Sequence, residues 1–290
     1  MTTPETQKRE LEVLIISDVH LGTYGSKAKE LYRYLKTVHP QRLILNGDIL
    51  DAWQFSKRYF PPAHLQVIRY IFEMIAQGVE VVYITGNHDE MMRKFVGIDL
   101  GRFKIANKVV LDHPNGDKTW VFHGDVFDVT MKHSKWIARL GAYGYGFLML
   151  LNKAVNFGLS AVGRKKISLA KRIKSSVKNA VQSKRNFSET AATLAAYKGY
   201  QFVACGHIHQ PDIQTIQTAK GQATYLNSGD WMDHLTALEY NHGAWQLYRY
   251  HQDPAMGQAA ATEKNATCTL SNHQLFEQML AEFGIAAAKV

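Results

Sequence analysis

The chain has 290 residues, 46% hydrophobic content and a formal net charge of +9, which is enough apolar material for one large domain and excludes a disordered chain. Its two cysteines are too few for a disulfide framework, and the first thirteen residues lack the cationic start and apolar core of a secretory signal, so we expect a reducing, cytoplasmic setting. The positive charge is local, because residues 130–186 hold 13 of the 34 basic residues and no acidic residue.

Short apolar runs alternate with amphipathic segments along the chain, which is the pattern of an α/β protein. The first three runs lie at residues 11–17, 42–46 and 79–85, and each is continuous enough to be a strand covered on both faces. Further strands are predicted over residues 119–122, 201–205, 223–226, 235–240 and 244–250.

Three helices are predicted between these strands. Residues 27–38 carry apolar side chains at helical spacing and are followed by Pro40, which is expected to close the helix. Residues 63–76 form a second helix that begins after a Pro-Pro pair. A third helix starts at the capping residues 188–190 and ends before the strand at residue 201.

Residues that can bind a metal follow five of the predicted strands. In an extended chain, residues two apart point to the same side, so Asp18 and His20 can share one ion, and so can His207 and His209. In chain order the five motifs are Asp18-Val19-His20, Gly47-Asp48-Ile49-Leu50-Asp51, Gly86-Asn87-His88-Asp89, His123-Gly124-Asp125 and Gly206-His207-Ile208-His209.

Each motif alone has an ordinary structural explanation. Gly-Asp and Gly-Asn pairs are common turn residues, and a lone buried histidine is more often a hydrogen-bonded core residue than a metal ligand. Five such motifs, each directly after a β-rich run, are not explained by turns, because strand ends in an α/β sheet meet at one edge. Together they predict a metal site at that edge.

The donor atoms restrict the ion. They are histidine nitrogens, carboxylate oxygens and the Asn87 side-chain carbonyl, with no thiolate, which suits Mn²⁺, Fe²⁺, Co²⁺ or Zn²⁺ in a catalytic rather than a structural site. There are more donors than one ion takes, so we expect two divalent ions about 3.5–4 Å apart, a pair that favours in-line displacement at phosphorus. Asn87 would add a neutral oxygen without the negative charge that repels a phosphate.

In this order the five motifs resemble those of the calcineurin-like metallophosphoesterase superfamily, over residues 12–250. The resemblance implies a four-layer α/β/β/α sandwich with a dinuclear site at the sheet edge. We therefore expect a metallophosphoesterase domain at residues 1–255, with a helical insertion or cap at residues 130–186. Residues 256–290 would form a tail that ends in a short amphipathic helix.

The resemblance also implies a role for each motif residue. Asp48 would bridge two ions, for which we expect Mn²⁺, and water would be the nucleophile. His88 would contact the phosphate and protonate the leaving oxygen, while Asp51 and Asp89 would orient histidines. The implied ligands of the first ion are Asp18, His20 and His209, and those of the second are Asn87, His123 and His207.

Within that superfamily the chain is most similar to the UDP-2,3-diacylglucosamine diphosphatase-like group. The similarity rests on residues 18–22 (DVHLG), 47–53 (GDILDAW) and 227–231 (NSGDW), and on the long insertion after His123. It implies cleavage of the diphosphate of UDP-2,3-diacylglucosamine, or of a close lipid-linked nucleotide, to UMP and an acylated sugar 1-phosphate in lipid A biosynthesis. The binding partner would be this acylated nucleotide-sugar. The protein would be cytoplasmic and peripherally associated with the inner membrane.

One residue departs from that group. Its established enzymes resemble GNRD at the third motif, where this chain has GNHD with His88. The departure leaves open a soluble phosphodiesterase or nucleotidase that acts on another substrate. A non-enzymatic scaffold of the same fold is a third hypothesis, but a scaffold does not need the His88 side chain.

Residues 130–186 are expected to select the substrate. Their first half is apolar and glycine-rich and their second half is basic, which fits a helix in a membrane interface or a cap over an acyl chain. Lys174, Lys178 and Asn179 share one helical face, and we expect them to contact the substrate. The alternatives are a helical hairpin packed on the sandwich, a solvated basic face and a nucleic-acid patch. We favour lipid or diphosphate binding and expect no nucleic-acid partner.

Overall fold

The computed structural model of the protein describes residues 8–52, 60–129 and 187–256. The insertion at residues 130–186 and the tail from residue 257 lie outside the described residues, so the predictions for them stand as predictions. From Arg249 onward the chain forms a second unit, whose described part holds the 3₁₀ helix η3 (Tyr250–Gln252). In the part of the chain that the structure describes, no helix is long and apolar enough to span a bilayer.

The first sheet has six strands in the order β11-β10-β1-β2-β3-β4. Strands β1 to β4 run parallel, and β10 pairs antiparallel with β1. Their register places Ile15 beside Ile44, so β1, β2 and β3 end at the same edge. The strands of this sheet are β1 (Arg9–Ile16), β2 (Val38–Asn46), β3 (Glu80–Ile84), β4 (Phe103–Ala106), β10 (Thr236–Asn241) and β11 (Ala244–Arg249).

The second sheet has five strands in the order β5-β6-β7-β9-β8. Strands β6, β7 and β9 run parallel, whereas β5 and β8 pair antiparallel with their neighbours. Val121 of β6 lies beside Ala204 of β7, so these two strands also end level. The strands are β5 (Lys108–Asp112), β6 (Lys118–Phe122), β7 (Phe202–Cys205), β8 (Asp212–Thr218) and β9 (Gly221–Asn227).

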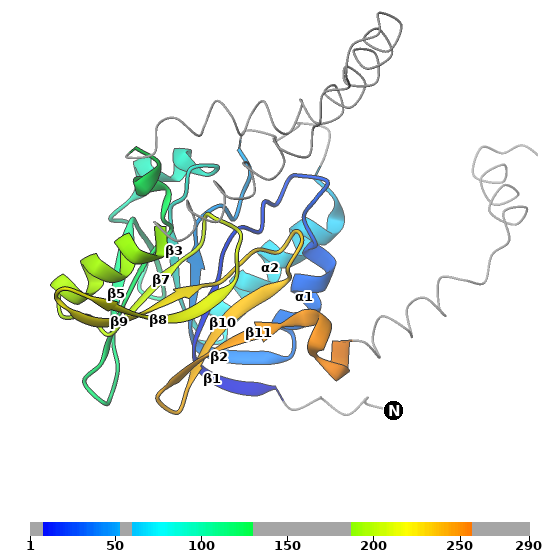
Figure 1. Ribbon diagram of the computed structural model, residues 1–290. Coiled ribbons are helices and arrows are strands. Elements are labelled where there is room, and N and C mark those ends of the chain that lie inside the picture. Colours follow the sequence, from blue (N-terminus) through cyan, green and yellow to red (C-terminus); the bar gives the residue numbers. More distant parts are fainter. Residues whose placement is uncertain (1–7, 53–59, 130–186, 257–290) are drawn as a thin grey trace, which may run out of the picture. The chain divides into compact units, whose positions relative to one another are not determined.

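The two sheets pack face to face between helices, which gives the predicted α/β/β/α sandwich (Figure 1). Because side chains alternate across a strand, each sheet has an inner and an outer face. The helices α1 (Ala28–Leu35) and α2 (Pro62–Ala76) cover the outer face of the first sheet, and a helix at residues 187–197 covers that of the second. The inner core joins Val13, Ile15, Ile44, Val82 and Ile84 to Leu111, Val121, Ala204 and Leu226.

The predicted role of Pro40 is wrong. Helix α1 ends at Leu35, and Pro40 lies inside β2. Proline has no N–H to donate to a neighbouring strand. The position tolerates it because β2 pairs there with β1 alone, at Leu11, and its pairing with β3 begins only at Arg42.

Three strands that the sequence did not predict, β4, β5 and β8, all lie at the edges of a sheet. An edge strand faces solvent along one side, so it needs no continuous apolar run. Strand β8, with the sequence DIQTIQT, has only exposed and partly buried residues. Two short 3₁₀ helices, η1 (Glu90–Phe95) and η2 (Asp125–Val129), follow β3 and β6.

Candidate metal centre

The five predicted motifs meet where the two sheets end side by side. Each motif follows the carboxyl end of β1, β2, β3, β6 or β7. Within the first sheet, Val19 N donates to Asp48 O at 3.0 Å, which continues the β1–β2 pairing into the loops. Between the sheets, His207 N donates to Asp18 Oδ2 at 3.1 Å. The backbone of the strands and loops therefore fixes the relative positions of the motifs.

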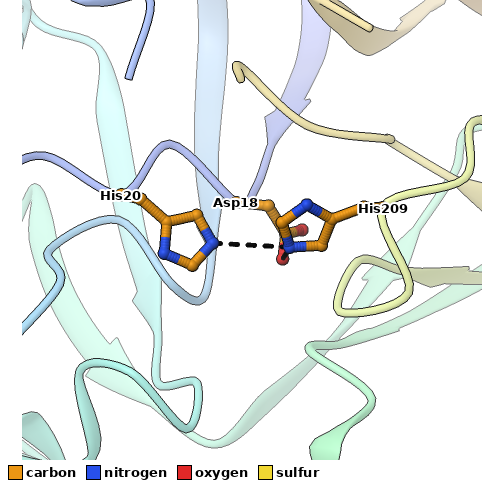
Figure 2. A group of neighbouring side chains, drawn as sticks. All are labelled: Asp18, His20 and His209. Carbon is orange, nitrogen blue, oxygen red and sulfur yellow. Dashed lines mark hydrogen bonds and ion pairs between the residues drawn. The ribbon is translucent and has the colours of Figure 1, made fainter. Parts of the chain in front are cut away.

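Asp18, His20 and His209, here called the Asp18 group, form one cluster (Figure 2). The Nε2 atoms of His20 and His209 are 3.4 Å apart, and His209 Nε2 lies 3.2 Å from Asp18 Oδ1. The three donor atoms lie within 4.8 Å of one another, close enough to coordinate one ion. The structure thus brings together the three residues that the resemblance assigns to the first ion.

Asp48, His123 and His207, here called the His123 group, form a second cluster. His123 Nε2 lies 3.2 Å from Asp48 Oδ2. On the other side of the ring, His123 Nδ1 donates to the backbone carbonyl of Asn46 at 2.8 Å. That bond directs the Nδ1 proton to the carbonyl, so Nε2 is the nitrogen that faces the cluster, as is usual for a metal-bound histidine.

A third cluster, of His20, Asp48 and His88, overlaps the other two. It shares His20 with the Asp18 group and Asp48 with the His123 group. The two groups are therefore continuous, with His88 beside the place where they join. The His88 side chain is 25% exposed, so it can reach a molecule outside the cluster.

Each central carboxylate uses one oxygen as an anchor and leaves the other toward the site. Asp18 Oδ2 accepts hydrogen bonds from His207 N and from the Ser17 hydroxyl. Asp48 Oδ1 accepts a bond from His88 N at 2.8 Å. The remaining oxygens, Asp18 Oδ1 and Asp48 Oδ2, are the ones that face His209 and His123. Both carboxylates are therefore held in place before any ion binds.

Asp51 and Asp89 have different hydrogen-bond partners. Asp51 Oδ2 accepts from His20 Nδ1 at 3.3 Å and from His88 Nδ1 at 3.0 Å, so it contacts two imidazoles. Among the described residues, Asp89 bonds to no histidine. Its carboxylate accepts from the Tyr83 hydroxyl and the Gly86 N–H, both at 2.6 Å, and from Ile49 N at 3.0 Å. Asp89 thus fixes the loops after β2 and β3.

The backbone at the metal-binding motifs is not extended, so the prediction that strand alternation brings the donor residues together is wrong. Two residues apart on a strand would share a side, but these residues have positive φ angles, between 51° and 66°. Residues other than glycine rarely adopt this backbone conformation, and it persists only where surrounding contacts hold it. A left-handed turn, and not strand alternation, brings these donors together. The residues are Asp18, His20, Asp48, His207 and His209.

Two glycines in the motifs are required by close packing against the ligands. A Cβ atom on Gly86 would overlap the Asp48 carboxylate and lie 2.6 Å from the Asp48 backbone nitrogen. A Cβ atom on Gly206 would lie 2.5 Å from Asp18 Oδ2 and from Ser17 Oγ. Neither glycine has a positive φ angle, so the turn itself does not demand them. They are needed because the site fills the space where a side chain would start.

Three donor atoms in the motifs are buried and make no hydrogen bond, although two of them lie 3.2 Å from the opposite member of an ion pair. They are Asp18 Oδ1, Asn87 Oδ1 and His123 Nε2. Buried polar atoms are almost always partnered, so three at one place need an explanation. Coordination of divalent ions would satisfy all three with the mixed nitrogen and oxygen donors that Mn²⁺, Fe²⁺, Co²⁺ or Zn²⁺ accept. The residues present therefore fit the metal ions that the sequence predicts.

The charges of the site also favour cations. Burial lowers the pKa of His123, but the negative charges of Asp48 and Asp18 outweigh it and raise the pKa to about 10. Burial raises the pKa of Asp18, yet its contact with His209 and the charge of His123 hold the pKa below the usual range. The carboxylates thus draw positive charge into a buried place, and a divalent cation competes with protons for it.

Residues 227–231 contributed only to the resemblance and were not predicted to take part in the metal site, but this segment after β9 packs behind the Asp18 group. Trp231 N donates to Asp18 O at 3.0 Å. The buried Asp230 carboxylate lies 2.5 Å from His234 Nδ1 and 3.9 Å from His209 Nδ1. The signal was present, because Gly229-Asp230 comes soon after the predicted strand at residues 223–226, as Gly47-Asp48 comes after the strand at residues 42–46. Lys174, Lys178 and Asn179 lie outside the described residues and remain predicted substrate contacts.

The chain matches one family profile and named bacterial proteins. The sequence profile described as "Calcineurin-like phosphoesterase" matches residues 11–211. The chain is 25% identical over 248 residues to UDP-2,3-diacylglucosamine hydrolase of Stenotrophomonas maltophilia (strain K279a), covering 82% of this chain and 98% of that protein. It is 23% identical over 227 residues to the protein of the same name from Pectobacterium carotovorum subsp. carotovorum (strain PC1), covering 76% and 91%.

Among solved structures, the chain is similar to a dimetal phosphatase from Danio rerio. The sequence identity is 12% and the TM-score is 0.40, and the match covers 82% of this chain and 95% of that one.

The packing of Gly86 generates a test of how the site is built. We expect Gly86→Ala to weaken Mn²⁺ binding by about tenfold to a hundredfold, because the new methyl group displaces the Asp48 carboxylate and supporting contacts of this kind have effects of that size. Isothermal titration of the full-length protein with Mn²⁺ measures the change.

Gly25→Ala is the matched control. Its Cβ would meet only the flexible end of the Met232 side chain, at 2.5 Å, so Mn²⁺ affinity should stay unchanged. A Gly86→Ala protein that binds Mn²⁺ as tightly as the Gly25→Ala protein would show that Asp48 is not placed as described.

Proposed function

Since the chain belongs to the calcineurin-like phosphoesterase family, and is therefore a metal-dependent hydrolase, we propose that it cleaves the diphosphate of an acylated UDP-sugar such as UDP-2,3-diacylglucosamine. The products would be UMP and an acylated sugar 1-phosphate. The name of the two relatives carries the substrate assignment, because the chain matches them over 98% and 91% of their length. The overlapping clusters of donor atoms support the chemistry.

Two divalent cations would occupy the site, with Mn²⁺ as the expected metal and Fe²⁺, Co²⁺ or Zn²⁺ as ions that the same donors accept. The Asp18 group would hold one cation, and His123 and His207 with Asn87 would hold the other. Asp48 would bridge them, since it belongs to two of the three clusters. Bound cations of this kind polarise a phosphoryl oxygen and lower the pKa of a water molecule.

His88 would supply the proton to the leaving oxygen. Its Nδ1 is bonded to Asp51 Oδ2 at 3.0 Å, which turns Nε2 away from Asp51. Its ring packs edge-on against His20, with 4.6 Å between the ring centres. The same Asp51 oxygen thus positions the proposed acid, His88, and a proposed metal ligand, His20, relative to each other. Proton transfer by a positioned histidine contributes about 10²- to 10⁴-fold to a rate.

The proposed setting is the cytoplasmic side of the inner membrane, where a peripheral protein would meet an acylated substrate. The basic insertion at residues 130–186, with Lys174, Lys178 and Asn179, would contact the diphosphate or the anionic surface. The second candidate function is a soluble phosphodiesterase or nucleotidase. It is favoured by one observation, the histidine at position 88 in place of the arginine expected for the lipid-specific group.

Product analysis separates the two functions. The full-length protein with Mn²⁺ is incubated with synthetic UDP-2,3-diacylglucosamine in detergent, and separately with bis(p-nitrophenyl) phosphate. We expect UMP and the acylated sugar phosphate to form in equal amounts, identified by mass spectrometry, because both come from one broken anhydride bond. Rapid cleavage of the aryl diester with no cleavage of the acylated UDP-sugar would contradict the lipid assignment.

Replacement of His88 tests the proposed proton donor. His88→Ala should lower kcat for the acylated UDP-sugar by about 10²- to 10⁴-fold, because the leaving oxygen then departs unprotonated. Metal content, measured by plasma mass spectrometry, should stay unchanged.

His39→Ala is the control, since this partly exposed histidine pairs with Glu10, near the start of β1 and away from the site. Its kcat should equal that of the unmodified protein. Loss of metal from the His88→Ala protein would instead make His88 a ligand, as its cluster with His20 and Asp48 would allow.

A further inference from the structure

Large apolar side chains are exposed around η1, on a surface here called the η1 face. Their exposed fractions run from 37% to 73%. Single exposed apolar residues are ordinary, but a group of this size on neighbouring elements usually marks a place of interaction. The members of the η1 face are Leu65, Phe72, Met91, Phe95, Val96, Ile98 and Leu100.

The η1 face is one connected surface. Phe72 of α2 and Met92 of η1 line the same wholly apolar cavity, of about 210 Å³, so these two elements adjoin. The segment after η1 runs along β4, since Gly97 N donates to Ile105 O at 3.0 Å and Leu100 N to Phe103 O at 2.9 Å. Leu65 lies two helical turns before Phe72 and therefore on the same side of α2.

Helix α2 shows why this surface is unusual. A helix on the surface of a globular protein normally has one apolar stripe toward the core and polar residues opposite. The inward side of α2 has its stripe, with Val67, Ile71 and Met74 buried. Its outward side nevertheless carries Leu65, 56% exposed, and Phe72, 61% exposed. The packing of α2 on the sheet does not require these outward residues to be apolar.

Basic side chains lie among the apolar side chains of the η1 face. Arg69 pairs with Glu73, and Lys104 pairs with Asp99, so these charges balance. Lys94 forms no ion pair with any described residue. The Arg102 guanidinium donates to the backbone carbonyl of Gly78 and not to a described acid. Lys94 and Arg102 are therefore available to an anionic partner, with Glu90 as the acid left beside them.

The η1 face borders the candidate metal centre. Leu21, Ile49 and Leu50, which line the inner wall of the cavity, follow directly after His20 and Asp48 in the chain. Helix η1 itself begins at Glu90, two residues after His88. The segments that form the η1 face and the cavity are thus consecutive in the chain with the loops that carry the site.

We propose that the η1 face docks on an anionic lipid bilayer. Phe95, Leu100 and their apolar neighbours enter the acyl boundary, while Lys94 and Arg102 meet lipid phosphates, the combination that interfacial segments use. The relevance to catalysis rests on the proposed function, because an acylated substrate would be drawn from that bilayer. The binding itself requires no turnover. It is also independent of the predicted role of residues 130–186, since it concerns a different part of the chain.

Vesicle binding tests the proposal. The full-length protein is sedimented with phosphatidylcholine vesicles containing phosphatidylglycerol, and the partition coefficient is measured for Phe95→Ser/Leu100→Ser and for Lys94→Glu. The double variant should bind about tenfold or more weakly, because two apolar side chains no longer enter the boundary. Lys94→Glu should bind roughly fivefold or more weakly to these vesicles.

Tyr197→Ser is the matched control, since Tyr197 is 66% exposed on the helix that covers the other sheet, and this variant should bind vesicles normally. All variants should hydrolyse bis(p-nitrophenyl) phosphate at the unmodified rate, which shows an intact site. Unchanged vesicle binding by the double variant would overturn the proposal. So would a dimer of the unmodified protein, seen by light scattering, that the double variant abolishes, since a second copy would then cover the face.

Failure of the proposed function is seen separately. A protein that binds vesicles through the η1 face but does not cleave the acylated UDP-sugar in detergent would refute the substrate and keep the membrane face. A protein that cleaves this substrate but binds vesicles independently of Phe95, Leu100 and Lys94 would refute the membrane face and keep the substrate.

Discussion

Carboxylates and imidazoles crowd into one buried place at the edge of two sheets, and much of the local structure follows from that crowding. Donor atoms of the Asp18 group lie 3.2–3.4 Å apart, and three donor atoms of the motifs have no hydrogen-bond partner. Lone pairs so close together repel one another unless positive charge lies between them. The left-handed turns, the two packed glycines and the hydrogen bond from His123 to Asn46 all keep these atoms together at a cost to local conformational freedom.

The anchoring of the donors explains how the site can be rigid without ions. Asp18 and Asp48 each use one carboxylate oxygen for a backbone N–H and keep the other for the site. His123 is held through Asn46, which joins the two sheets. Asp51 holds His20 and His88 with a single oxygen. Because these partners come from parallel strands whose register is fixed, the site is positioned by the core of the sandwich and not by flexible loops.

The sequence predicted the strand ends and the donor residues because buried parallel strands leave strong apolar runs, and their ends carry the chemistry. It did not predict the left-handed backbone of Asp18 or His20, since that conformation depends on contacts with another strand and another sheet. Edge strands such as β8 were missed because they carry no apolar run. Pro40 was assigned to a helix end because the pairing partners of β2, which permit it, cannot be read locally. The η1 face was missed because exposure is a property of the folded chain.

Crystals of the full-length protein grown with Mn²⁺ test the dinuclear centre most directly. Anomalous difference maps at the manganese edge should show two peaks about 3.5–4 Å apart. One peak should lie within coordination distance of the Asp18 group and the other within that of His123, His207 and Asn87, with Asp48 between them. A single peak, or peaks that do not contact these side chains, would contradict the two-cation site.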